Sequence, residues 1–77
     1  MELHSIDTLS EGRDDDRRVL LVVVAVMRGW NPTEVIKFAT ACLEAWGEEV
    51  ISARLYSIEL DTGPMAGRHV IGISCEV

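Results

Sequence analysis

The longest run of apolar residues in the chain extends from Val19 to Met27 and reads VLLVVVAVM. This run is too short to cross a bilayer as a helix, which needs about 20 residues. Valine is β-branched and packs better on a strand than on a helix, so the composition predicts a strand. Because strand side chains alternate between two faces, both faces of this strand are apolar and are expected to be buried.

A helix is predicted directly after this strand. Asn31 is a favoured N-cap residue, Pro32 suits the first helical position, and Glu34 can complete a capping box. Apolar residues then recur at helical spacing, and Gly47 is the expected residue just beyond the helix end. The apolar face of this helix is predicted to comprise Val35, Phe38, Ala39, Cys42, Leu43 and Trp46.

Two further strands are predicted over Val50–Leu60 and Arg68–Val77, joined as a hairpin by the connection 61–67. The last strand alternates cleanly between apolar and polar residues, which predicts one buried face. The alternation of the earlier strand breaks at Tyr56 and Ser57, which indicates a β-bulge. The first strand, the helix and the second strand form a crossover unit, so those two strands are expected to run parallel.

Residues 1–18 are interpreted as a polar leader. Leu3, Ile6 and Leu9 recur every three residues, a spacing that fits either a short helical turn or an additional strand of the sheet. Consecutive aspartates diverge instead of converging on an ion, so the run 14–16 is not expected to bind metal. The fold class predicted is α+β, with one helix on a three-stranded β-α-β-β sheet over 19–77 and a leader that could add a short strand.

Composition limits the class of protein. The chain has 77 residues, 48% of them hydrophobic, and a net charge of −6, which together predict one small folded domain that is marginally stable alone. The negative charge argues against direct binding to nucleic acid, and no membrane partner is expected. The N-terminus lacks the pattern of a secretory signal, so a cytoplasmic location is expected.

A single helix can cover only one face of the predicted sheet. The other face would carry half of the valine run, and an exposed apolar face of this kind normally marks a partner surface. We therefore expect a homo-oligomer. The residues assigned to this partner surface are Leu20, Val22, Val24 and Val26.

Candidate catalytic groups are sparse. His4 and His69 have no serine, cysteine or carboxylate at a motif spacing, and His69 is expected to pack or face solvent at a strand start. Cys42 and Cys75 are too far apart in sequence for a CxxC motif or a zinc knuckle, and both fall on predicted core faces. We expect neither an enzyme nor a metal site, and a disulfide between these cysteines stays open.

The order of elements, the NPT helix start at 31–33 and the SIELD end of the second strand at 57–61 carry a family resemblance. About three quarters of the chain, from residue 19 to 77, resembles dodecins, small flavin-binding proteins that assemble as hollow dodecamers. The resemblance implies self-assembly and a flavin cofactor stacked on strand two. That stretch reads Ala53-Arg54-Leu55-Tyr56 here and contains no tryptophan. The implied ligand-binding residues are Arg54 and Tyr56, with Trp30, otherwise a hydrophobic staple against Val35.

An acidic interaction module is the alternative function. Glu44, Glu48 and Glu49 place negative charge at the end of the helix, where the helix dipole prefers positive charge. A basic group is expected to offset them, either Arg54 or Arg68 of the chain or of a second copy. In this alternative the acidic residues block a basic or nucleic-acid-binding protein surface.

Overall fold

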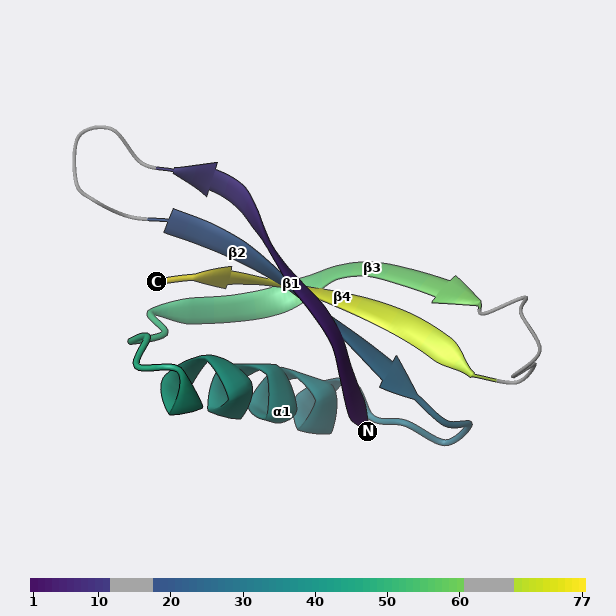
Figure 1. Cartoon of the computed structure of the whole chain (residues 1–77). Helices are drawn as coiled ribbons and strands as arrows, with labels where there is room; N and C mark the ends of the chain where they lie inside the picture. The colour runs from purple at the N-terminus through teal and green to yellow at the C-terminus, as the bar shows by residue number, and fades with distance from the viewer. Residues whose placement is uncertain (12–17, 61–67) are drawn as a thin grey trace.

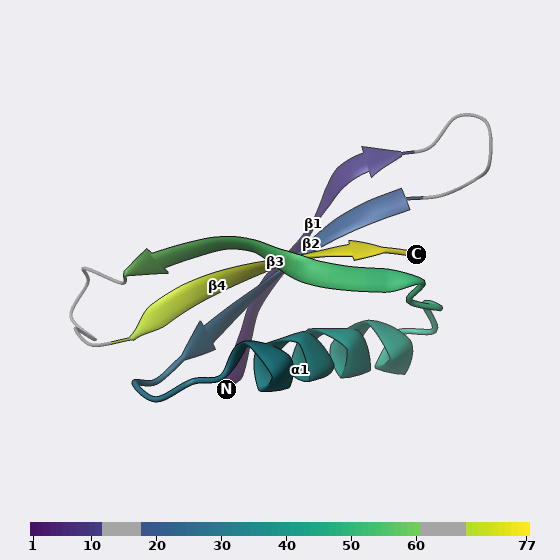
Figure 2. The same ribbon diagram turned by 180° about the vertical axis from the view of Figure 1, so that it is seen from behind.

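The computed structural model describes residues 1–11, 18–60 and 68–77. They form a four-stranded antiparallel sheet with one helix across one of its faces (Figure 1). The view from behind shows the same two layers and the strong twist of the sheet (Figure 2). The elements are β1 Glu2–Glu11, β2 Arg18–Val26, α1 Pro32–Ala45, β3 Ser52–Leu60 and β4 His69–Glu76.

The strands lie in the order β1-β2-β4-β3, so β2 and β4 are interior strands and β1 and β3 are the edges. β4 pairs antiparallel with both β2 and β3. β2 and β3 therefore run in the same direction, as the crossover through α1 predicts, with β4 between them. The predicted hairpin of β3 and β4 is confirmed, whereas its connection 61–67 lies outside the described residues.

The hydrophobic core lies between α1 and the sheet face that α1 covers. β2 and β4 contribute most of it because they are interior strands, and their alternate residues point toward the helix. The helix contributes Val35, Ala39 and Leu43, all fully buried. The strand residues of the core are Leu20, Val22, Val24, Val26, Ile71, Ile73 and Cys75.

The helix begins and ends as its sequence predicts. The Asn31 side chain accepts hydrogen bonds from the backbone N–H groups of Thr33, at 2.8 Å, and Glu34, at 3.3 Å. These bonds satisfy two amides that lack partners within the helix. Gly47 has φ of +89°, the left-handed conformation that ends many helices and that glycine adopts without strain.

The α+β class with a single helix on a sheet is confirmed, but the predicted three-stranded sheet has a fourth strand, because the leader forms an additional strand, one of its two predicted alternatives. The supposed leader contains β1, a ten-residue strand that pairs with β2 along its length. The register of β1 shifts between Leu3 and Ser5 and again between Thr8 and Ser10. Residues three apart in a regular strand lie on opposite faces. The extra residue at the first shift brings Leu3 and Ile6 to the same face, where both pack against the core.

The predicted orientation of β2 needs a correction. Leu20, Val22, Val24 and Val26 were assigned to a partner surface, but all four are buried beneath α1. The opposite face of β2 carries Val19, Leu21, Val23 and Ala25. Since both sets are apolar, the sequence pattern alone does not distinguish the face that the helix covers.

Two predictions on single aromatic residues have different outcomes. The β-bulge at Tyr56 is confirmed, because the pairing of β3 with β4 shifts by one residue between Leu55 and Ser57. Trp46, predicted to lie on the buried face of the helix, is the C-cap residue instead and is 67% exposed. The helical phase no longer applies at the cap, so its side chain is not directed into the core.

Candidate functional site

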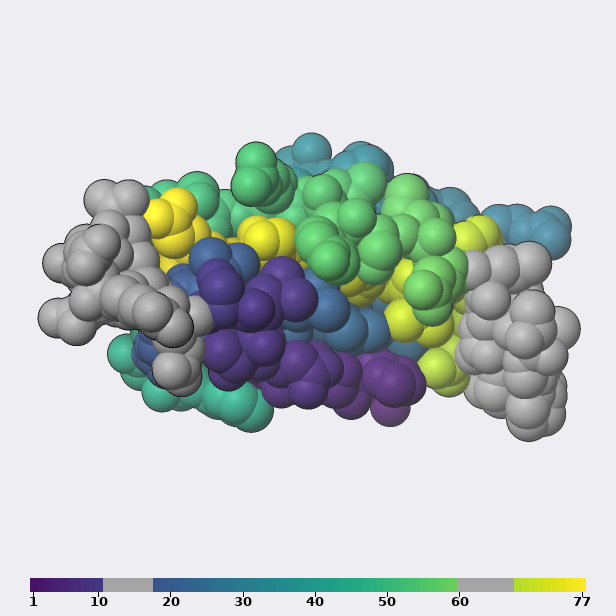
Figure 3. All heavy atoms as spheres, turned by 90° about the horizontal axis from the view of Figure 1, so that it is seen from above, coloured from purple at the N-terminus to yellow at the C-terminus, as the bar shows by residue number. Residues whose placement is uncertain are grey.

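The face of the sheet opposite α1 has no covering layer among the described residues (Figure 3). The side chains of β2 on this face form an apolar strip, in which Leu21 and Val23 are half-buried. The flanking strands add polar and charged groups to the same face. These are Ser5 and Asp7 on β1, and Arg54, Ser57 and Glu59 on β3. The uncovered face is therefore an apolar strip with polar borders.

Gly72 on β4 makes room for side chains of the neighbouring strands on this face. A Cβ atom at Gly72 would lie 2.5 Å from Ser57 Oγ and 3.1 Å from Leu21 Cδ1. The first separation is too short for two nonbonded heavy atoms, so a side chain here would displace its neighbours. The absence of a side chain at Gly72 thus lets β3 and β2 side chains approach each other above β4.

The outer edge of β3 carries the main concentration of exposed apolar side chains. Leu55 is 39% exposed, Tyr56 is 59% exposed and Ile58 is 50% exposed. Leu55 pairs with Ile73 and Ile58 pairs with Ile71, so both lie on the helix side of the sheet. α1 therefore covers the start of β3, where Ala53 packs against the core, but leaves Leu55 and Ile58 exposed. No described strand pairs with the outer side of β3.

The three residues expected to bind an aromatic ligand are not brought together within one chain. Trp30 packs against the core, and its ring lies 6.3 Å from that of His69 between centroids. His69 is opposite Leu60, at the far end of β3 from Arg54. Arg54 lies on the uncovered face, since it pairs with Ser74. Arg54 and Tyr56 are thus neighbours on β3, whereas Trp30 belongs to the other side of the sheet.

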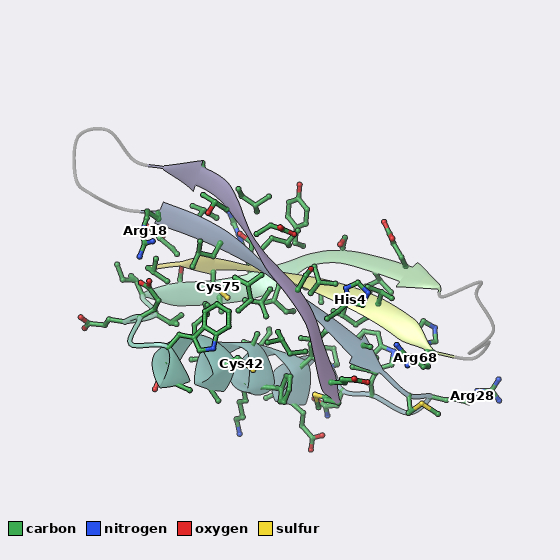
Figure 4. The ribbon with its side chains drawn as sticks, viewed as in Figure 1. His4, Arg18, Arg28, Cys42, Arg68 and Cys75 are labelled. Carbon is green, nitrogen blue, oxygen red and sulfur yellow. The ribbon has the colours of Figure 1, made fainter. Side chains whose placement is uncertain are left out.

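Glu44, Glu48 and Glu49 gather around a hollow of about 420 Å³ at the C-terminal end of the helix, together with Gly47 and Val50. Arg18 at the start of β2 donates to both carboxylate oxygens of Glu48, each at 2.6 Å. Figure 4 shows Arg18 at this end of the molecule, with Arg68 and Arg28 at the other. Among the described residues, the basic partner of this cluster is therefore Arg18, and not Arg54 or Arg68 as predicted.

The two cysteines are free thiols with different surroundings. Cys75 on β4 is buried, and its burial raises the pKa of the thiol above the ordinary value of 9.0. Desolvation disfavours the thiolate, which is the reactive form of cysteine. Cys42 on α1 is only half-buried. Cys75 thus fits the predicted role of a small core residue.

A second hollow, of about 210 Å³, lies beside the N-terminus, where β1 begins and β2 ends. It is lined by Met1, Glu2, Ala25, Val26, Met27 and Arg68. The sequence gives no indication of this hollow, because the pairing of β1 with β2 creates it. The Nδ1 atom of His69 nearby is buried and has no hydrogen-bond partner among the described residues.

Over the described ranges, no three histidine, cysteine, aspartate or glutamate side chains are grouped so that they could hold a metal ion. The one described helix is also too short to span a bilayer. Comparisons of the chain with protein-family models, with curated proteins and with solved structures find no match in any of the three.

Proposed function

We propose that this chain is a small non-enzymatic module that assembles with copies of itself. The observation that supports the proposal most directly is the exposed apolar edge formed by Leu55, Tyr56 and Ile58. An edge strand offers unpaired backbone N–H and C=O groups, and apolar side chains at such an edge favour addition of another strand. The uncovered face beside this edge offers further apolar area through Leu21 and Val23.

Sedimentation equilibrium of the whole chain over a range of micromolar concentrations tests this proposal. A self-assembling module gives a weight-average mass that rises with concentration above the monomer mass of 8.5 kDa. A mass that stays at 8.5 kDa throughout the range would refute the proposal.

The proposal includes binding of an aromatic small molecule by the assembly, with a flavin as the ligand to test. Tyr56 supplies an exposed aromatic ring, and Arg54 supplies a cation two positions away on the same strand. Aromatic rings stack on planar ligands, and a guanidinium can pair with an anionic ligand group. Titration of free flavin with the protein should quench flavin fluorescence, and Tyr56→Ala should abolish the quenching. No quenching by the unaltered chain would remove the ligand from the proposal.

A second candidate function, binding of a basic protein surface, is supported by the hollow that gathers Glu44, Glu48 and Glu49. Opposite charges across an interface accelerate encounter, and salt screens them. Binding of a cationic peptide, such as polylysine, is the test. Affinity should fall as ionic strength rises and should decrease in Glu44→Gln. Binding that is independent of salt would contradict this candidate.

A further inference from the structure

The sequence of β3 is complementary to itself when two copies of the strand lie antiparallel. In a pairing centred between Tyr56 and Ser57, Arg54 lies opposite Glu59 of the second copy, and Leu55 lies opposite Ile58 of the second copy. Each of these pairs occurs twice, because a two-fold axis relates the copies. Residues directly opposite each other in an antiparallel pair have Cβ atoms about 5 Å apart, which is close enough for both kinds of contact.

The faces of the sheet agree with this pairing. Arg54 and Glu59 pair with Ser74 and Val70 on the uncovered face, so both side chains point away from α1. They are five positions apart, and an uninterrupted strand would place them on opposite faces. The extra residue at the Tyr56 bulge corrects the phase. Charged side chains therefore meet charged ones on one face of the joined sheet.

The same phase correction places Leu55 and Ile58 together on the helix side. Both are exposed in the single chain, and each would be covered by its counterpart from the second copy. Pairs of branched apolar residues directly opposite each other stabilise antiparallel strands. The pairing thus removes from water the apolar side chains that α1 leaves uncovered.

Other registers are less favourable. A shift by one residue places Arg54 opposite Ile58, and these side chains belong to different faces. A shift by two in the direction of the N-terminus keeps the faces matched but places Arg54 opposite Ser57, which loses both charge pairs. Among the described residues, neither Arg54 nor Glu59 has an ion-pair partner within its own chain.

We infer that β3 is a docking edge for a second copy of this chain, and that the two copies form a continuous eight-stranded antiparallel sheet across β3. Both helices lie on the same face of that sheet, because the two-fold axis is perpendicular to it. This inference rests on the proposed self-assembly and specifies its surface, its register and its symmetry.

Charge reversal at the two positions tests the register. Arg54→Glu and Glu59→Arg each replace two attractive contacts by two repulsive ones, so each variant should associate at least roughly tenfold more weakly than the unaltered chain. The double variant Arg54→Glu/Glu59→Arg restores opposite charges across the axis and should recover the original association. Both side chains are exposed, so the fold, followed by circular dichroism, should be unchanged.

A mixture of the two single variants tests the register more directly. In a heterodimer of Arg54→Glu with Glu59→Arg, an acidic side chain faces a basic one at both ends of the pairing. Two variants that are monomeric separately should therefore form a dimer of twice 8.5 kDa when mixed. Asp7→Lys, which reverses an exposed charge on β1 at the other edge, is the matched control and should leave association unchanged.

The outcomes separate this inference from the proposed function. If the unaltered chain associates but both single variants associate equally well, the β3 pairing is wrong and self-assembly uses another surface. If the mixture of single variants does not associate, the register is wrong. If the unaltered chain is monomeric at all concentrations, both the inference and the proposed function are wrong.

Discussion

The two edge strands of the sheet are similar in length but differ in what they present to solvent. β1 turns Leu3 and Ile6 inward onto the core, and its exposed side chains include those of His4 and Asp7. Its pairing with β2 is also interrupted twice. β3 is interrupted once, and it exposes Leu55, Tyr56 and Ile58.

The difference shows how one sheet can protect one edge and leave the other available. Bulges and charges disturb the regular ladder that an incoming strand needs, and both occur on β1. On β3 the single bulge leaves charges that match those of a second copy, and the apolar residues beside them are uncovered. We therefore expect association at β3 and not at β1.

The largest expected effect comes from a charge placed in the apolar part of each edge. Ile58→Lys should weaken self-association roughly 30-fold, because Ile58 lies near the centre of the pairing and loss of a hot-spot residue there costs about 2 kcal/mol. Leu9→Lys, at an exposed apolar residue of β1, should leave association unchanged. Sedimentation equilibrium measures both. Equal losses in the two variants would contradict the distinction between the edges.

A substitution at Gly72, which pairs with Ser57 between β4 and β3, should have the next largest effect. Gly72→Ala places a methyl group against Ser57 Oγ and Leu21 Cδ1, the ends of two side chains that can turn aside, so the overpacking should cost about 1 kcal/mol of the free energy of unfolding. Urea unfolding measures this cost. Adding Ser57→Gly, which removes the closer of the two contacts, should recover part of it, and Ser74→Ala on the same strand should have little effect. No recovery in the double variant would show that Ser57 is not the obstacle.

A smaller effect is expected at the ion pair that ties the β1 side of the sheet to the helix end. Arg18, opposite Glu11 of β1, is bonded to Glu48 beyond α1. Both side chains are partly exposed, so Glu48→Gln should lower the free energy of unfolding by less than about 1 kcal/mol. The loss should disappear at high salt, where the pair is already screened. Glu49→Gln is the neighbouring control. A larger loss of the free energy of unfolding in Glu49→Gln than in Glu48→Gln would contradict a stabilising contact between Arg18 and Glu48.

The smallest effect on stability concerns Cys75, which lies opposite Ala53 of β3 and Leu20 of β2. Its pKa is raised by burial, so the unfolded chain loses the thiol proton at a lower pH than the folded chain. Its contribution to stability is complete below pH 9 and is lost as pH rises through the folded pKa. Unfolding measured from pH 8 to 10 should show this decline, and Cys75→Ala should remove it.

Thiol labelling of the folded chain gives the companion measurement. A disulfide reagent should modify half-buried Cys42 first and Cys75 only when the core between α1 and the sheet opens. Rapid labelling of Cys75 in a Cys42→Ala background would show that this core opens readily, and would contradict the protected position of Cys75.

The parts of the fold that the sequence predicts are those set by local chemistry. Asn31, Pro32 and Gly47 determine the limits of the helix through capping and backbone conformation, so α1 lies where it is predicted. The valine run predicts β2 for the same reason, since β-branching acts within a few residues. The break of alternation at Tyr56 likewise indicates the bulge.

The parts that the sequence does not predict depend on contacts between distant segments. β1 is ambiguous in the sequence because the register shift between Leu3 and Ser5 replaces the two-residue period of a strand by the three-residue spacing of Leu3 and Ile6, which a helical turn fits equally well. The two faces of β2 are equally apolar, so only the position of α1 decides that Val22 is core and Val23 is not. The pairing of Arg18 with Glu48, 30 residues away, also depends on tertiary placement.

The bulge at Tyr56 makes association depend on the length of β3 as well as on its composition. Deletion of the Tyr56 codon would leave every other pair with β4 in register, because Leu55 would still face Ile73 and Ser57 would still face Gly72. The fold would thus tolerate the deletion, while the outer edge would lose its one irregularity and accept a further strand more readily. Arg54 and Glu59 would then be four positions apart and would stay on one face without a bulge, so the deletion should strengthen association at β3.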